Sequence, residues 1–147
     1  MDLKYQIKDR LMSAGVKPSL QRMQVLEYLT EHPVHPTVDM IFLALSPAIP
    51  TLSKTTVYNT LKLLEEQGVI QSITIDEKNV RYDADTSAHA HFKCKGCGKI
   101  EDLYSEVLNP NALEKYNYLQ FTDAQVYYRG YCTECQKEFN ERFSINK

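Results

Sequence analysis

The four cysteines of this 147-residue chain form two C-x-x-C pairs, Cys94 with Cys97 and Cys132 with Cys135. A C-x-x-C turn brings two sulfurs close enough to share one tetrahedral ion, and two such turns fill all four of its positions. A closed set of four thiolates is typical of structural zinc (Zn²⁺). The intervening segment 98–131 is longer than that of a simple zinc ribbon, so the ion would join the two ends of a small domain.

A thioredoxin-like dithiol is the competing interpretation of the cysteines. It needs a C-x-x-C at the N-terminus of a helix in an α/β context, where the thiolate is stabilised. Here there are two pairs, and the first follows a strand-like segment and enters a turn that contains Gly96. The pattern favours zinc, and a small zinc or thiol redox protein stays open as the alternative of another class.

Two of the four histidines, His89 and His91, are separated by one residue in a segment that reads as extended. In a strand they project from the same face, which is the geometry of a paired ligand donor. Carboxylates flank them, namely Asp83 and Asp85 before and Glu101 and Asp102 after. Nitrogen and oxygen donors suit Fe(II), Mn(II) or Zn(II) better than copper. A second metal site is therefore one interpretation of this cluster, and solvated acids that happen to lie beside histidines are the other. A lone histidine such as His32 is expected at the surface.

The first half of the chain reads as helical. The apolar residues Leu3, Ile7 and Leu11 recur at helical spacing, and Gly15 ends that segment. Three further helices each follow a residue that caps helices well. Ser19 precedes a helix to about residue 29, Thr37 one that ends near 47, and Ser53 one that ends at Gly68.

A change of periodicity follows the fourth helix. Residues 69–75 and 80–82 favour two strands, and 76–79 a turn between them. Helices followed by a hairpin predict a winged helix-turn-helix; a plain helical domain with a terminal hairpin is the alternative. Further on, 91–94 and 125–128 favour strands, and a short helix is expected from Thr133. We expect a first domain over 1–83, a hinge over 84–88 and a second domain over 89–147.

Composition and charge exclude several classes of protein. With 17 Lys and Arg against 19 Asp and Glu, the formal charge is −2, which argues against nucleic-acid binding through bulk positive charge but allows a local DNA-binding face. No segment approaches the roughly 18 apolar residues of a membrane span, and the N-terminus lacks the apolar core of a signal peptide. We therefore expect a cytoplasmic protein that does not bind membranes, whose cysteines are ligands rather than disulfides.

No enzyme motif is recognisable. The sequence offers no assignable Ser/His/Asp arrangement, no Gly-rich phosphate loop and no H-E-x-x-H. A non-enzymatic role is the expectation.

Taken in order along the chain, several segments resemble the ferric uptake regulator family of metal-dependent bacterial repressors. They are GVKPSLQR (15–22), HPTVD (35–39), TTVYNTL (55–61), RYD (81–83), HAHFKCKGCGKI (89–100) and CTEC (132–135). The resemblance implies an α+β protein, with an N-terminal winged helix-turn-helix and a small C-terminal α/β dimerisation domain. It also implies a homodimer that binds double-stranded operator DNA. The implied ligands of a regulatory Fe(II) or Mn(II) are His35, Asp83, His89, His91 and Asp102.

The fourth helix is the expected recognition helix. With Val57, Leu61 and Leu64 facing inward, its outward stripe is polar and suits the major groove. The candidate DNA contacts on it are Lys54, Thr55, Tyr58, Asn59 and Lys62, and a merely solvated face is the alternative. The resemblance adds Lys17 and Arg22 as contacts to phosphate or to the minor groove.

Within the family, the details resemble the peroxide-sensing branch. That branch has aspartate at the positions of Asp83 and Asp102, where iron sensors often have glutamate. A further metal site of many iron sensors needs an acid where Ala90 stands and a histidine in the later strand, and 125–128 has none. A zinc sensor would add a cysteine, and all four are already assigned. Hydrogen peroxide is thus the expected signal, oxidising His35 or His91; iron or manganese sensing without this chemistry is the alternative.

Overall fold

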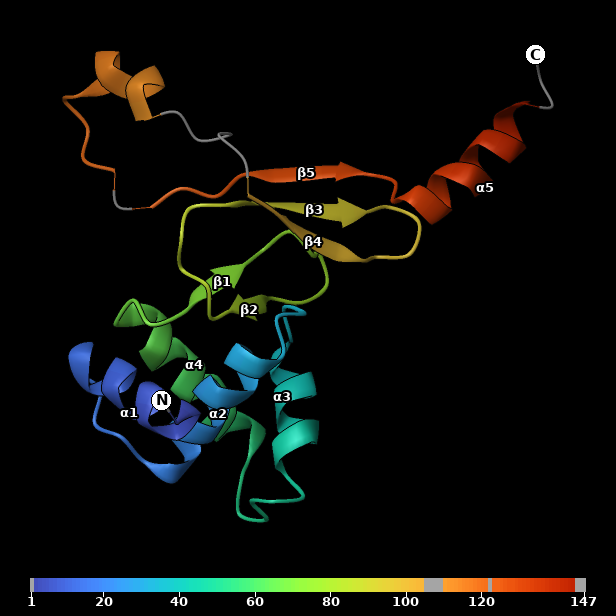
Figure 1. Ribbon diagram of the computed structural model, residues 1–147. Helices are drawn as coiled ribbons and strands as arrows, with labels where there is room; N and C mark the ends of the chain where they lie inside the picture. Colours follow the sequence, from blue (N-terminus) through green and yellow to red (C-terminus); the bar gives the residue numbers. More distant parts are fainter. Residues whose placement is uncertain (1, 105–109, 122, 145–147) are drawn as a thin grey trace. The chain divides into compact units, whose positions relative to one another are not determined.

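The computed structural model describes residues 2–104, 110–121 and 123–144. The chain divides into two compact units, Met1–Thr86 and Ser87–Lys147. The first contains α1 (Leu3–Ser13), α2 (Leu20–Glu31), α3 (Val38–Leu45), α4 (Lys54–Glu66), β1 (Gln71–Ile73) and β2 (Arg81–Asp83). The second contains β3 (Ala90–Cys94), β4 (Ile100–Leu103), the 3-10 helix η1 (Pro110–Tyr116), β5 (Tyr127–Gly130) and α5 (Thr133–Ser144) (Figure 1).

The helices of the first unit begin where local signals predict. The side chains of Ser19, Thr37 and Ser53 each accept a hydrogen bond from the backbone N–H three residues later, which satisfies an amide that the helix itself leaves unpaired. Gly68, at φ +73°, ends α4 in the left-handed conformation that favours glycine. The predicted caps are therefore confirmed.

The hairpin of the first unit is shorter than predicted. Strands were expected over 69–75 and 80–82, but β1 spans Gln71–Ile73 and β2 spans Arg81–Asp83, paired antiparallel with Ser72 opposite Tyr82. Val69 and Ile70 are buried instead in the apolar cluster of the helices, and the N–H of Val69 bonds to the carbonyl of Leu64. These two residues thus complete the end of α4 rather than starting a strand.

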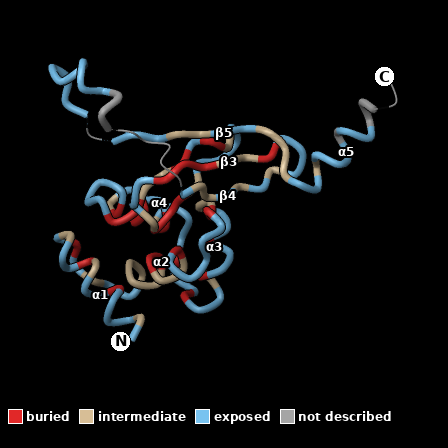
Figure 2. The backbone as a smooth tube through the Cα atoms, turned by 45° about the horizontal axis from the view of Figure 1, so that its top comes forward, coloured by how far each residue is buried: buried red, intermediate tan, exposed pale blue. Residues whose placement is uncertain are grey.

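A single apolar cluster holds the first unit together. Its members come from every helix and from the hairpin, and those at the centre are fully buried, among them Leu11, Leu26, Ile41, Leu61 and Leu64 (Figure 2). Arg10 ties α1 to both ends of the hairpin region, since its Nη2 donates to the carbonyls of Val69 at 2.6 Å and Ala84 at 2.5 Å. Burial lowers the pKa of this guanidinium, although nearby Asp85 and Asp83 oppose the shift.

The second unit is built on a three-stranded sheet in the order β4-β3-β5. β3 pairs antiparallel with β4 and parallel with β5. Sequence patterns predicted β3 and the helix from Thr133, placed β5 two residues too early, and missed β4. Ile100 and Leu103 are the only strongly apolar residues in β4, so its pattern was too weak to detect.

No helix in the described part of the chain has the length and apolar character needed to cross a membrane.

Candidate metal centres and nucleic-acid interface

The four cysteines meet at one end of the three-stranded sheet. Cys94 ends β3, Cys97 lies in the following turn, Cys132 immediately precedes α5 and Cys135 lies in its first turn. Their Sγ atoms all lie within 4.8 Å of one another, and those of Cys97 and Cys132 are 3.8 Å apart. Sulfurs bound at about 2.3 Å to one tetrahedral ion would be about 3.8 Å apart, so the arrangement fits zinc.

Backbone amides prepare this cluster for negative charge. Sγ of Cys94 accepts the N–H groups of Gly96 and Cys132, each at 3.3 Å. Backbone donors, first that of Cys132, lower the pKa of the Cys94 thiol to about 6. By contrast, hydrogen bonding to the neighbouring thiol of Cys132 raises the pKa of Cys135 to about 12. The backbone stabilises one thiolate, whereas further thiolates beside it are disfavoured. Four thiolates at this separation would therefore be stable only with a cation bound between them.

Gly96 is required by the close approach of the two turns. A Cβ at this position would lie 2.7 Å from Sγ of Cys135 and 2.9 Å from its Cβ. Real Cβ atoms do not approach neighbours so closely, so any larger residue must displace a ligand. The sequence indicated a turn here but gave no sign of this contact, because Cys135 is distant in the chain.

The second cysteine pair does lie at a helix N-terminus, which is the position expected of a redox dithiol. Its sulfurs, however, lie beside those of the first pair. Four converging sulfurs favour a closed metal site over an exposed dithiol.

In the first unit, His35 and Asp83 lie side by side. Nε2 of His35 is 3.4 Å from Oδ2 of Asp83, and both side chains are buried. The other carboxylate oxygen of Asp83 accepts the N–H of Asp85 at 2.9 Å, which orients Oδ2 toward the imidazole. An imidazole nitrogen and a carboxylate oxygen at this separation can share one cation.

The backbone of His35 is strained. Its φ of +56° is in the left-handed region, which costs a residue other than glycine about 1–3 kcal/mol. Two contacts from β2 hold the loop in this shape: Nη1 of Arg81 donates to the carbonyl of His35, and the N–H of Tyr82 to the carbonyl of Pro36, at 3.1 and 3.0 Å. Strain of this kind is typical of functional sites.

In the second unit, His89 and His91 converge on one oxygen of Asp102. Their Nε2 atoms lie 3.5 and 3.3 Å from Oδ1 of Asp102. The register explains this placement, because His91 on β3 pairs directly with Asp102 on the antiparallel β4. Nδ1 of His89 lies 2.7 Å from the carbonyl oxygen of Ser87, which can only accept a hydrogen bond, so Nδ1 carries the hydrogen. Nε2 of His89 then keeps its lone pair and is the nitrogen that can bind a metal.

Both groups of donors fit Fe(II) or Mn(II), which bind imidazole nitrogen and carboxylate oxygen. Among the other residues weighed as ligands, Glu101 is paired with Lys99 at 2.7 Å. His32 is exposed, stacks on Tyr28 and bonds to its carbonyl, as expected for a histidine without a metal role.

The predicted outward stripe of α4 is exposed. Its members are Lys54, Thr55, Tyr58, Asn59 and Lys62, whereas Val57, Leu61 and Leu64 are buried. Lys54 forms an exposed ion pair with Asp39 of α3, with Nζ 3.2 Å from Oδ1. An exposed pair of this kind is worth at most about 1 kcal/mol, so Lys54 can exchange Asp39 for a phosphate at small cost.

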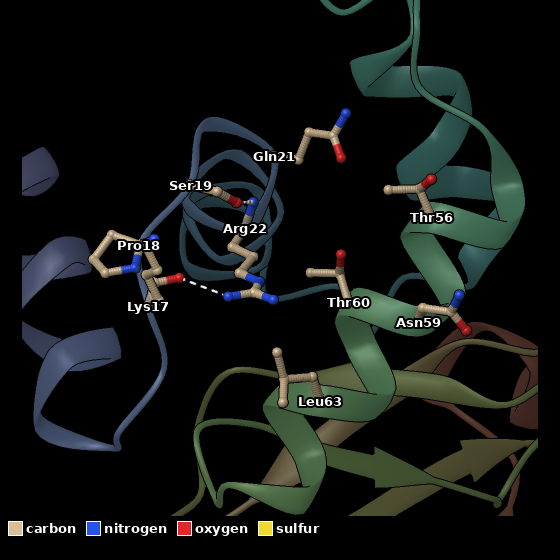
Figure 3. A pocket seen from close by; sticks show the side chains of 9 residues that line it. All are labelled: Lys17, Pro18, Ser19, Gln21, Arg22, Thr56, Asn59, Thr60 and Leu63. Atoms are coloured by element: carbon tan, nitrogen blue, oxygen red, sulfur yellow. Dashed lines mark hydrogen bonds between the residues drawn. The ribbon is translucent and has the colours of Figure 1, made fainter.

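Lys17 and Arg22 border a cleft of about 480 Å³ between the start of α2 and α4 (Figure 3). Nη1 of Arg22 donates to the carbonyl of Lys17 at 2.8 Å, which holds the guanidinium at the rim. The sequence did not indicate that Gln21, Thr56 and Thr60 share this lining, since Gln21 is on α2 and the two threonines lie beside the stripe of α4 rather than on it. The full lining is Lys17, Pro18, Ser19, Gln21, Arg22, Thr56, Asn59, Thr60 and Leu63.

Comparison with known proteins shows the family to which the chain is similar. Residues 13–129 match the model of the ferric uptake regulator family. The peroxide-responsive repressor PerR of Staphylococcus aureus is 36% identical over 128 residues, which is 86% of each chain. The solved peroxide stress regulator of Campylobacter jejuni is 30% identical, with a TM-score of 0.68, covering 92% of this chain and 100% of that one.

The fold extends to more distant structures. The ferric uptake regulator Fur of Helicobacter pylori superposes with a TM-score of 0.73 over 92% of this chain and 95% of its own, at 24% identity. At that identity the likeness concerns the fold alone. A family model that covers most of the chain, and a curated relative above one-third identity, lead to the same conclusion: this protein belongs to the ferric uptake regulator family of metal-dependent repressors.

Proposed function

We propose that this protein is a repressor that releases operator DNA when hydrogen peroxide oxidises a histidine that binds its regulatory Fe(II). The observation that carries the proposal is the pairing of imidazoles with the aspartates Asp83 and Asp102. The similarity to the peroxide-responsive repressor of Staphylococcus aureus supports the choice of signal.

Two kinds of metal site follow from the donor chemistry. Cys94, Cys97, Cys132 and Cys135 hold a structural zinc. One regulatory Fe(II) or Mn(II) takes its ligands from both domains, namely His35, Asp83, His89, His91 and Asp102. The domains are the DNA-binding domain 1–83 and the dimerisation domain 89–147, with 84–88 as the hinge. Because both contribute ligands, metal binding favours one relative orientation and can shift the population toward the form that binds DNA.

The chain's own residues explain how the signal acts. Fe(II) held by these residues would activate hydrogen peroxide, whose O–O bond breaks so that one oxygen is added to an imidazole carbon and the other leaves as water. His35 and His91 are the residues we expect to gain an oxygen atom. An oxidised imidazole is a poorer ligand, so the two domains lose their shared ion. Mn(II), which cleaves peroxide less readily, leaves the repressor active.

DNA recognition follows from the exposed stripe of α4. Tyr58 is suited to a thymine methyl and Asn59 to an adenine edge, whereas Lys17, Arg22, Lys54 and Lys62 suit phosphates, with Thr55 beside them. In a homodimer, two such helices read half-sites one helical turn or a multiple apart. A repressor of this kind acts in the cytoplasm, with no membrane partner.

An iron- or manganese-sensing repressor is the second candidate, because the same ligands can act without peroxide chemistry. A zinc or thiol redox protein is less consistent with the structure, since all four sulfurs converge on one point.

Peroxide treatment of protein loaded anaerobically with Fe(II) is expected to add one oxygen to the peptide that contains His35 or His91, and to weaken operator binding in parallel. Peptide mass spectrometry and a DNA-binding titration measure the two effects. Protein loaded with Mn(II) is the control and should change in neither. Retained DNA binding and no oxygen gain in the iron sample would identify an iron or manganese sensor instead.

Asp102→Ala removes the carboxylate that both His89 and His91 contact. We expect affinity for Mn(II) to fall at least about tenfold, and the metal dependence of DNA binding to be lost, while zinc is retained. Glu101→Ala, at the adjacent residue of β4, should behave like wild type. DNA binding by Asp102→Ala that still responds to metal would refute the assignment.

Asn59→Ala should weaken binding to the cognate operator by about 1–3 kcal/mol and relax the preference at one base pair. Lys62→Ala should instead weaken binding to all sequences and reduce the slope of log K against log salt by about one. Titrations at several salt concentrations, on the operator and on unrelated DNA, separate the two. Equal effects of both variants on both DNAs would argue against base contact by Asn59.

Gly96→Ala should lower zinc affinity by about tenfold or more, because its methyl group overlaps Sγ of Cys135 and overpacking of this kind typically costs about 1–3 kcal/mol. Competition with a chromogenic chelator measures the zinc affinity. Lys95→Ala changes an exposed side chain in the same turn and should have no effect. Equal zinc affinity in both variants would show that the cysteine turns do not share one ion.

A further inference from the structure

Arg81 links the hairpin of the first unit to the loop that carries His35. It is the first residue of β2, and its Nη1 donates to the carbonyl oxygen of His35 at 3.1 Å. The two residues are 46 positions apart in the chain. The contact therefore exists only because the strand packs beside this loop.

Asp76 fixes the guanidinium of Arg81. Nε and Nη2 of Arg81 each lie 3.1 Å from Oδ2 of Asp76, and the two side chains are only 22% and 11% exposed. The other oxygen of Asp76 accepts the N–H of Lys78 at 3.0 Å, so the carboxylate is itself held by the turn of the hairpin. One edge of the guanidinium is thus anchored, and Nη1 reaches the His35 loop in a set direction.

The loop has reason to need such a restraint. His35 combines a left-handed φ with a following proline, and the ring of Pro36 further restricts the conformations open to the residue before it. Two consecutive residues of β2, Arg81 and Tyr82, bond to the carbonyls of His35 and Pro36. The next residue of the strand, Asp83, meets the His35 imidazole.

We propose that Arg81 is a positioning residue for the regulatory metal: anchored by Asp76, it holds the backbone of His35 so that the imidazole is ready to bind the ion. The inference rests on the proposed function, because it takes His35 as a ligand. Arg81 itself does not touch the metal.

The direction in which metal affinity changes when Arg81 is replaced distinguishes a positioning role from a purely electrostatic one. A guanidinium near a divalent cation repels it, so if charge alone mattered, removing Arg81 would strengthen metal binding. If Arg81 positions His35, its removal weakens binding. Arg81→Lys sharpens the distinction, because lysine keeps the charge but lacks the planar fork that contacts Asp76 and His35 at once.

The experiment measures Mn(II) affinity of zinc-loaded protein by competition with a fluorescent chelator. Arg81→Gln and Arg81→Lys are each expected to weaken Mn(II) binding about tenfold, as loss of a group that supports a ligand typically does. Lys78→Gln removes one positive charge from the same hairpin at an exposed position and should leave the affinity unchanged. Thermal unfolding of the zinc-loaded variants in the absence of Mn(II) establishes that each is folded. Asp76→Asn keeps Arg81 but weakens its anchor, so this variant should also weaken Mn(II) binding.

A double-mutant comparison tests the route through His35. In a His35→Ala background, adding Arg81→Gln should produce no further loss of Mn(II) affinity, since the ligand that Arg81 positions is already gone. An additive tenfold loss would show that Arg81 acts elsewhere. Wild-type affinity in Arg81→Gln, or tighter binding, would overturn the inference while leaving the proposed function intact. If the wild type has no Mn(II) site that depends on Asp83, both the proposed function and the inference about Arg81 are overturned.

Discussion

The second unit must be held together with few buried apolar side chains among the residues that the structure describes. The contiguous apolar cluster lies wholly within the first unit. Among residues of the second unit whose burial is described, only Ala90 and Cys94 count as buried apolar side chains. A unit of this kind is stabilised by other means, and metal binding to four thiolates provides roughly 10–16 kcal/mol in small zinc domains. Zinc held by the four cysteines would stabilise this unit as the apolar cluster stabilises the first.

The pairing of strands in the sheet also fixes the position of His91 relative to Asp102. Cys94, one of the four clustered cysteines, and His91 lie on the same strand, and β4 places Asp102 directly opposite His91. Zinc held by the cysteines would therefore stabilise the strand that also carries His91. In the first unit the hairpin positions His35, because three consecutive residues of β2, namely Arg81, Tyr82 and Asp83, contact His35 or Pro36. Each unit therefore arranges its own set of imidazole and carboxylate donors.

The DNA-binding face illustrates why net charge is a weak guide to partners. A chain with a formal charge of −2 still presents Lys54, Lys62 and Lys17 at exposed positions around one helix and one cleft. Asp39 pairs with Lys54 in the structure. If Lys54 contacts DNA as proposed, it exchanges a weak surface ion pair for a phosphate contact, so that affinity would depend on the local arrangement of charges rather than on net charge.

Features that depend on residues close together in the chain can be predicted from the sequence. Ser19, Thr37 and Ser53 begin helices because a cap acts over three residues, and each C-x-x-C presents two sulfurs for the same reason. Proximity to the two histidines made Asp102 one of four candidate carboxylates, whereas His35 was proposed by the family resemblance and by no local signal. Tertiary structure alone decided that Asp102 lies opposite His91, that Cys135 leaves room only for glycine at position 96, and that Arg81 reaches the carbonyl of His35. It also decided that Val69 and Ile70 join the helical core instead of a strand. These contacts join residues far apart in the chain, and only the packing of strands, loops and helices against one another brings such residues together.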